Sequence, residues 1–430
     1  MMLPDRLVQL QTRIRAGQLS VQQALHAQLQ RAQALRVHTA CVVDTLPITS
    51  GTEGPLAGIA LSHKDIFNLH DRLPGCGVGP GRPETGVKPA AALAALADAG
   101  ASQWATLVMA PYACGATGQN PHFDRCMNPL DNDAAVGGSS SGSAVAVASG
   151  MTYAALGTDT AGSVRIPAAT CGLIGLKTTH GAVSTEGCVP LAPSLDSVGV
   201  LSRYAEDARQ IWQAICPQAP HSNVQQSQTV GDWRCRLWLP QSGVDPEVGQ
   251  AIRDWVVQWG LQESPVDLAP EFELLNRHAQ RVLFFETART HRPALLAGQA
   301  DAAVQAIGMM GLAIPQQWYQ QSLTWRAVLL EQFVTHHFAQ AELLILPSLG
   351  CLLPDWQTVE LGHPAFDRHR LSAMHAFMGF VNYLGLPALN LPIAHDAKQR
   401  PICVQVLARP FAEHRLLDFA AQVELKDRMN

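Results

Sequence analysis

Short apolar runs and stretches with a helical spacing of apolar residues alternate along this chain. The apolar runs predict buried strands at CVVDT (41–45), GIALSHKDIF (58–67, running into a turn), SQWATLVMA (102–110), ELLILP (342–347) and PICVQVLA (401–408). The clearest helical patterns are DPEVGQAIRDWVVQWG (245–260) and SLTWRAVLLEQFVTHHFAQA (322–341). A capping box at Ser20 predicts a further helix near the N-terminus, with Leu25 and Leu29 on one face. This alternation indicates an α/β fold in which helices cover both faces of a sheet.

The organisation of the chain favours one domain over residues 1–430. A length of 430 residues with 47% hydrophobic residues is enough for one large core. Residues from about 245 to 340 have a mostly helical pattern, and no linker-like composition flanks them. We therefore expect this stretch to be a helical insertion or cap within the domain.

Charge and motif content exclude several classes of function. The net charge is -5, without a run of like charges, so we expect neither nucleic-acid nor anionic-membrane binding. No apolar run reaches the roughly 18 residues of a spanning helix, and we expect a cytoplasmic protein. The ten cysteines form no C-x-x-C pair, and no H-E-x-x-H or cysteine–histidine spacing suggests zinc. A small-molecule ligand, with no metal or other cofactor, is the expectation.

The most conspicuous candidate chemistry is the run GGSSSGS at residues 137–143, which precedes the small-residue helix pattern SAVAVA. A flexible Gly/Ser loop is one interpretation. A nucleophile elbow around Ser140 would need a preceding strand, and DNDAAV is a poor strand. A β-lactamase-like S-x-x-K is absent, because no lysine follows a serine by three residues. For the run taken alone, the flexible loop is the favoured interpretation.

A second serine, Ser163, lies 24 residues after Ser139 in GTDTAGSVRIPA. Together, GGSSSGSAVAVASGMTYAALGTDTAGSVRIPAATCG resembles the signature block of the amidase signature family. The segments GLIGLKTTHGAVSTEGCVPLAPSLDSVGVLSRYAEDA, NYLGLPALNLP and PICVQVLARPFAEHRLLDFAAQVE also resemble that family. The resemblance implies an α/β/α sandwich with a large twisted mixed β-sheet.

The resemblance also implies a Ser-Ser-Lys catalytic arrangement. Ser163 matches the nucleophile, and Lys64, in SHKDIF, matches the lysine. Ser139 matches the bridging serine, whose peptide bond to the preceding residue is cis in the family. None of the three serines in the run would then be the attacking group.

The chemistry of lysine is consistent with this assignment. A serine hydroxyl needs a base to accept its proton, and lysine can act as a base only when it is neutral. The apolar residues before Lys64 suggest a buried strand end, where desolvation lowers a lysine pKa by up to about 3–5 units. A surface pairing with Asp65 is the alternative interpretation.

The turn that carries Ser163 predicts the remaining parts of a site. Backbone N–H groups of Thr160, Ala161, Gly162 and Ser163 are the expected oxyanion donors. Asp159 would accept backbone donors and hold the turn. Ala161 replaces the family's usual glycine, and we expect its methyl group to restrict the turn.

Four further residues are candidates for substrate binding. Arg165 would either bind a substrate carboxylate or brace the loop. Ala113, Cys114 and Gly115 match a family segment near the acyl side of the substrate, with Cys114 a wall residue rather than a nucleophile. Asp196, in SLDSVG, is interpreted as structural.

The sequence thus predicts an amidase that hydrolyses a small-molecule carboxamide. Two alternatives remain: the amidase-type subunit of a glutamine-dependent tRNA amidotransferase, and a catalytically silent binding protein on the same fold. The oligomeric state is open, with a homodimer or a small accessory subunit both compatible with the sequence.

Overall fold

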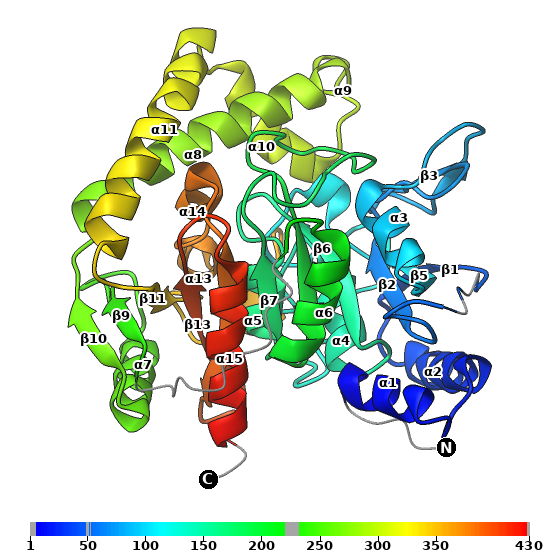
Figure 1. Ribbon diagram of the computed structural model, residues 1–430. Coiled ribbons are helices and arrows are strands. Elements are labelled where there is room, and N and C mark those ends of the chain that lie inside the picture. The colour runs from blue at the N-terminus through cyan, green and yellow to red at the C-terminus, as the bar shows by residue number, and fades with distance from the viewer. Residues whose placement is uncertain (1–5, 49–50, 52, 220–231, 428–430) are drawn as a thin grey trace.

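An 11-stranded sheet forms the centre of the molecule (Figure 1). The computed structural model describes residues 6–48, 51, 53–219 and 232–427. The strand order is β1-β5-β2-β6-β8-β7-β12-β13-β11-β9-β10. These strands are β1 (Val42–Thr45), β2 (Ala60–Lys64), β5 (Ser102–Leu107), β6 (Ala154–Asp159), β7 (Ile174–Lys177), β8 (Ser197–Ser202), β9 (Arg234–Leu237), β10 (Gln262–Pro265), β11 (Leu343–Pro347), β12 (Ala388–His395) and β13 (Pro401–Leu407). A separate short pair consists of β3 (Arg72–Leu73) and β4 (Arg82–Pro83).

The sheet is mixed, as expected. Strand β2 runs parallel to both of its neighbours, β5 and β6. Strand β8 runs antiparallel to β6 and β7, and β12 runs antiparallel to β7 and β13. The apolar runs of the sequence form β1, β2, β5, β11 and β13. Strands β2, β11 and β13 are buried along their whole length, whereas β1 lies at the sheet edge and is only partly buried.

Helices pack against both faces of this sheet, which confirms the predicted sandwich. The helices are α1 (Leu7–Arg15), α2 (Val21–Arg36), α3 (Ala91–Asp98), α4 (Ser141–Ala148), α5 (Arg165–Thr170), α6 (Ala205–Ile215), α7 (Pro246–Trp259), α8 (Ala269–Thr290), α9 (Arg292–Leu296), α10 (Ala302–Leu312), α11 (Gln316–Phe338), α12 (Trp356–Val359), α13 (Arg368–His375), α14 (Gly379–Leu384) and α15 (Glu413–Asp427), with a 3-10 turn η1 (Pro111–Ala113). The predicted capping box at Ser20 begins α2.

Alternation along the central strands divides the core between the two faces. In β6, Leu156 belongs to the cluster that includes residues of α6 and α15, whereas its neighbour Ala155 belongs to the cluster that includes α4. In β8, Val200 and Leu201 divide in the same way. Successive side chains of a strand point to opposite faces, so each strand contributes to both layers.

The stretch from 245 to 340 is mostly helical but includes one strand of the main sheet. Strand β10 pairs with β9 at the sheet edge, and α7 packs against the neighbouring strands. The sequence QESP at this strand has no apolar alternation, so its pattern did not indicate a strand. Helices α8 to α11 gather at one end of the molecule, at the top of Figure 1.

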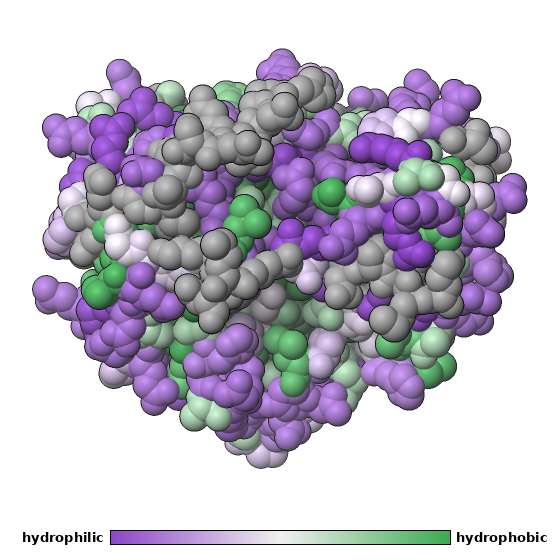
Figure 2. Space-filling view, turned by 60° about the horizontal axis from the view of Figure 1, so that its bottom comes forward, coloured by the Kyte–Doolittle hydropathy of each residue, from purple (hydrophilic) through white to green (hydrophobic). Residues whose placement is uncertain are grey.

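Hydrophilic residues dominate the face of the molecule shown in Figure 2, where hydrophobic residues occur in small groups. Such scattered apolar residues are normal on protein surfaces. Among the described helices, none combines the length and apolar character needed to cross a membrane.

Candidate active site

The three predicted catalytic residues come from separate elements that meet at the carboxyl ends of two central strands, β2 and β6. Lys64 is the last residue of β2, and Ser163 follows the end of β6 at Asp159. Because β2 and β6 run parallel with Ser62 opposite Ala155, their carboxyl ends lie side by side. Ser139 lies just before α4, which packs against both strands.

Lys64 is fully buried and contacts two hydroxyl groups. Its Nζ donates to Ser139 Oγ at 2.7 Å and to Thr158 Oγ1 at 2.9 Å. Burial lowers the pKa of Lys64 to about 7, although the nearby carboxylates of Asp196 and Asp159 oppose this shift. The surface pairing with Asp65 is therefore wrong, because Lys64 points into the protein. Sequence reasoning missed Thr158, although it lies in the same GTDTAGS motif as Ser163.

Ser139 and Ser163 differ in exposure. Ser139 is fully buried and follows a cis peptide bond from Gly138, as the family resemblance predicted. Ser163 is 8% exposed, so its hydroxyl is the more accessible of the two. The backbone N–H of Ser140 donates to the Ser163 carbonyl at 3.2 Å, which brings the two serine segments together. A direct contact between the two hydroxyl groups stays a prediction.

Asp159 organises the turn before Ser163. Its carboxylate accepts the N–H of Gly162 at 2.9 Å and of Val164 at 3.1 Å. The prediction that Gly162 supplies an oxyanion donor is therefore wrong, because Asp159 takes its N–H. The N–H groups of Thr160, Ala161 and Ser163 meet no acceptor in the part of the chain that the structure describes, so these three remain available.

Glycine is required at Gly162 rather than at the preceding position. Gly162 has a φ of 109°, and a Cβ there would lie 2.6 Å from Met378 Cγ. Ala161 is half-buried and is not among the residues with positive φ. The alanine that departs from the family pattern therefore fits the turn without backbone strain.

Arg165 braces the turn and does not face a ligand. Its guanidinium is fully buried and donates to Asp159 at 2.8 and 3.0 Å, and to Asn382 Oδ1 at 2.6 Å. Burial alone would raise the pKa of Asp159, but the Arg165 charge holds that pKa well below its usual range. Of the two roles considered for Arg165, the structure supports bracing. Binding of a substrate carboxylate by this residue is excluded by its burial.

The segment with Ala113, Cys114 and Gly115 lies beside Ser139. A Cβ on Gly138 would lie 2.6 Å from the Gly115 carbonyl oxygen, and Ala113 lines a pocket. Burial raises the pKa of Cys114 to about 12, so its thiol stays protonated at neutral pH. Cys114 is thus unsuited to be a nucleophile, in agreement with the sequence interpretation.

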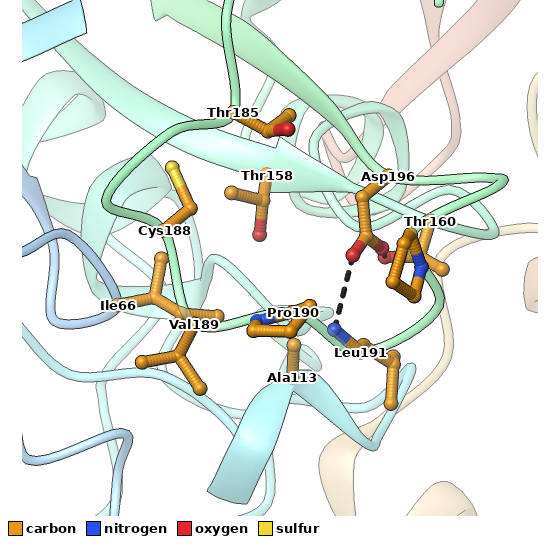
Figure 3. Close-up of a pocket in the computed structure, with 11 residues that line it drawn as sticks. Ile66, Ala113, Thr158, Thr160, Thr185, Cys188, Val189, Pro190, Leu191 and Asp196 are labelled. Atoms are coloured by element: carbon orange, nitrogen blue, oxygen red, sulfur yellow. Dashed lines mark hydrogen bonds between the residues drawn. The ribbon is translucent and has the colours of Figure 1, made fainter. Parts of the chain in front are cut away.

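A small and mostly apolar pocket is lined by Thr158 and Thr160 of the GTDTAGS motif (Figure 3). In Figure 3, Ile66 and Val189 lie on one side, Asp196 and Thr160 on the other, and Thr158 between them. Asp196 accepts the Thr160 hydroxyl at 2.5 Å, so the residue interpreted as structural also lines the pocket.

Helices α8 and α11 hold the loop 190–196 that forms part of this pocket. Glu286 of α8 accepts the N–H of Ser194 at 2.9 Å, the Ser194 hydroxyl at 2.5 Å and the Tyr319 hydroxyl at 2.8 Å. Arg326 of α11 donates to the Ser194 carbonyl at 2.7 Å. Sequence reasoning missed these residues, because a glutamate and a serine 92 positions apart give no local signal.

We expect Glu286→Ala to lower kcat/KM for amide hydrolysis about tenfold and stability by about 1–3 kcal/mol, because Ser194 and Tyr319 lose a buried acceptor. Steady-state kinetics and urea unfolding measure both effects. Glu273→Ala is the matched control, since Glu273 lies on the same helix in an exposed pair with Arg277. Equal effects of the two substitutions would show that Glu286 does not position the loop.

No group of three or more His, Cys, Asp or Glu side chains is placed to hold a metal ion within residues 6–48, 51, 53–219 and 232–427. The groups that the described site offers for chemistry are a buried lysine, two serines and backbone donors.

Comparison with known proteins identifies the family. A family model described as Amidase matches residues 18–236 and 272–417. The chain belongs to this amidase signature family. Its members are hydrolases that act on carbon–nitrogen bonds.

Relatives of this family member carry the names of different enzymes. The chain is 27% identical over 458 residues to the A subunit of glutamyl-tRNA(Gln) amidotransferase from Alkalilimnicola ehrlichii, covering 94% of this chain and 93% of the relative. It matches the crystal structure of an amidase with a TM-score of 0.85 and 27% identity, covering 98% of this chain and 99% of the other. A 6-aminohexanoate cyclic dimer hydrolase shares the fold, with a TM-score of 0.81, 22% identity and coverage of 98% and 97%.

Proposed function

We propose that this protein hydrolyses a small-molecule carboxamide through an acyl-enzyme on Ser163, with Ser139 and Lys64 as the proton relay. The observation that carries the proposal is the 2.7 Å contact between the fully buried Lys64 and Ser139. A lysine with a pKa of about 7 is substantially neutral at neutral pH and can accept a proton.

The proposed reaction proceeds in two stages. Ser163 Oγ attacks the amide carbonyl carbon while its proton passes through Ser139 to Lys64, and the N–H groups of Thr160, Ala161 and Ser163 stabilise the oxyanion. The C–N bond then breaks, and the relay returns the proton to the leaving ammonia or amine. Water attacks the acyl-enzyme in the same way, which releases the carboxylic acid and restores the Ser163 hydroxyl.

The test is a screen for ammonia release across aliphatic, aromatic, amino-acid and ureido amides, combined with fluorophosphonate labelling. We expect hydrolysis of at least one amide class and covalent labelling at Ser163. A folded protein that neither releases ammonia nor reacts with the probe would instead be a silent binding protein on this fold.

A second candidate function is the amidase-type subunit of a glutamine-dependent tRNA amidotransferase. It is supported by relatives such as the Alkalilimnicola ehrlichii protein, which matches almost the whole chain. Co-purification separates the two functions. A complex whose glutaminase activity requires a partner protein favours the amidotransferase, whereas activity of the isolated chain, as a monomer, homodimer or with a small accessory subunit, favours the free amidase.

The pH profile tests the role of Lys64. We expect kcat/KM for a neutral amide to rise about tenfold per pH unit below pH 7 and to level off above it, since only neutral Lys64 accepts the proton. Rates between pH 5 and 9 measure this limb. A flat profile over that range would contradict the proposed base.

Lys177 provides a matched control for this profile. It is also fully buried, and burial lowers its pKa to about 7, but its Nζ donates to the carbonyls of Thr178 and Leu386. The limb should therefore persist in Lys177→Met, provided that circular dichroism shows a folded protein. If Lys177→Met lost the rise of kcat/KM with pH, the group that titrates near pH 7 would be Lys177 and not Lys64.

A further inference from the structure

The pocket of Figure 3 borders the segments that carry the proposed catalytic residues. Thr158 lines the pocket and also accepts a hydrogen bond from Lys64 at 2.9 Å. Thr160 lines it too and lies three residues before Ser163. Ala113 lines it from the segment beside Ser139. The pocket is thus bordered by the same strand end and turn that hold the proposed catalytic residues.

The size of this pocket limits the acyl group. Its volume is about 50 Å³, about one third of the roughly 150 Å³ cavity that accommodates benzene in a protein interior. Its apolar wall comes from Ile66, Val189 and Leu191, together with Ala113 and the prolines at 190 and 193. A short aliphatic chain fits such a space, whereas an aromatic ring does not.

The charge of the pocket limits the acyl group further. Both carboxylate oxygens of Asp196 accept backbone N–H groups, with Leu191 N at 3.0 Å from one oxygen and Ala192 N at 3.2 Å from both. Burial raises the pKa of Asp196, and these donors together with the Thr160 hydroxyl oppose the rise. The three donors to the Asp196 carboxylate stabilise its ionised form. Asp196 therefore places a negative charge at the pocket wall.

No cation offsets this charge among the residues that line the pocket. The described lining contains no lysine, arginine or histidine. Arg165 is fully buried against Asp159, and Lys64 Nζ donates to Ser139 and Thr158 rather than to Asp196. A substrate with a carboxylate on its acyl chain would enter without a counter-ion and would be repelled by Asp196.

We propose that this pocket selects amides with short, uncharged aliphatic acyl chains, and that Asp196 and Leu191 determine the selection. Asp196 excludes acyl chains that end in a carboxylate, as in dicarboxylic half-amides. Leu191 limits the length and width of the chain. The inference rests on the proposed amidase function and names the substrate class of that same site.

The test compares butyramide with succinamate, whose chain of the same length ends in a carboxylate, and with glutamine and benzamide. Ammonia release from the full chain gives kcat/KM for each. We expect butyramide to exceed succinamate by about 100-fold or more, because like charges repel strongly at low dielectric. Glutamine should also be poorer than butyramide, since its chain bears two charged groups that the pocket lining does not pair. Benzamide, which is also uncharged, should have a lower kcat/KM than butyramide.

Two variants test whether Asp196 and Leu191 determine which acyl chains are accepted. Asp196→Asn should reduce the preference for butyramide over succinamate to less than about tenfold. Because Asp196 also holds Thr160, Leu191→Ala provides an independent variant, and it should raise the ratio of benzamide to butyramide at least about tenfold by enlarging the pocket. Fluorophosphonate labelling of Ser163 in each variant shows that the site remains assembled.

The outcomes separate this inference from the function on which it rests. Succinamate or glutamine as the best substrate would overturn the inference and leave the amidase function in place. Unchanged selectivity in both labelled variants would overturn the assignment to Asp196 and Leu191. Hydrolysis of ureido amides alone would overturn the inference and leave the amidase function in place, whereas failure to hydrolyse any amide in this panel and in the wider screen would overturn both.

Discussion

Replacement of Ser163 by alanine is expected to reduce amide hydrolysis at least about 10⁴-fold. The substitution removes the atom that forms the acyl-enzyme. Rapid quenching followed by mass spectrometry should detect an acyl adduct in the wild type and none in Ser163→Ala. Alanine differs from serine only by the missing hydroxyl oxygen, so circular dichroism should be unaltered.

The other two residues should show a different and smaller loss. Lys64→Ala and Ser139→Ala remove proton transfer, which is worth about 10²–10⁴ in rate. Because Lys64 acts through Ser139, the double variant should be little worse than the poorer single variant. An activated anilide keeps the residual rates measurable.

One result would contradict proton transfer through Ser139 to Lys64. If Lys64→Ala retained turnover near that of the wild type, lysine would not be the base. The proposed mechanism would then have to be abandoned, while the amidase fold would be unaffected. Losses in the two single variants that multiplied in the double variant would show that Lys64 and Ser139 act independently.

Breaking the buried pair of Arg165 and Asp159 should give the largest loss of stability. We expect Arg165→Met to lower the free energy of unfolding by about 3–5 kcal/mol, because it leaves the buried Asp159 carboxylate without its counter-ion. Activity should fall with it, since Asp159 also holds the N–H groups of Gly162 and Val164 beside Ser163. Urea unfolding followed by circular dichroism measures the change.

Arg277→Met is the matched control for this prediction. Arg277 pairs with Glu273 at the surface, with side chains 57% and 80% exposed, and such a pair is worth about 0–1 kcal/mol. The two substitutions remove the same charge from the same kind of ion pair and differ in burial. Equal shifts of the unfolding midpoint would show that the buried pair has no special role in stability.

Much of the secondary structure could be predicted locally, and the exceptions have a physical cause. The run LLILP at 343–347 is a strand because residues buried on both sides of a sheet are mostly apolar. Strand β10, with the sequence QESP, lies at the sheet edge. An edge strand needs no continuous apolar run, so its pattern is indistinguishable from that of a loop.

The sequence by itself determined the fold class and the three catalytic candidates, because their motifs are contiguous and specific. Tertiary structure alone decided the surroundings of these residues. It turned Arg165 inward, gave the Gly162 N–H to Asp159 and placed Thr158 against Lys64. It also joined Glu286 to Ser194, 92 residues apart, and set Asp196 in the pocket wall. Orientation and charge environment depend on which distant segments pack together, and no local pattern of apolar and polar residues records that choice.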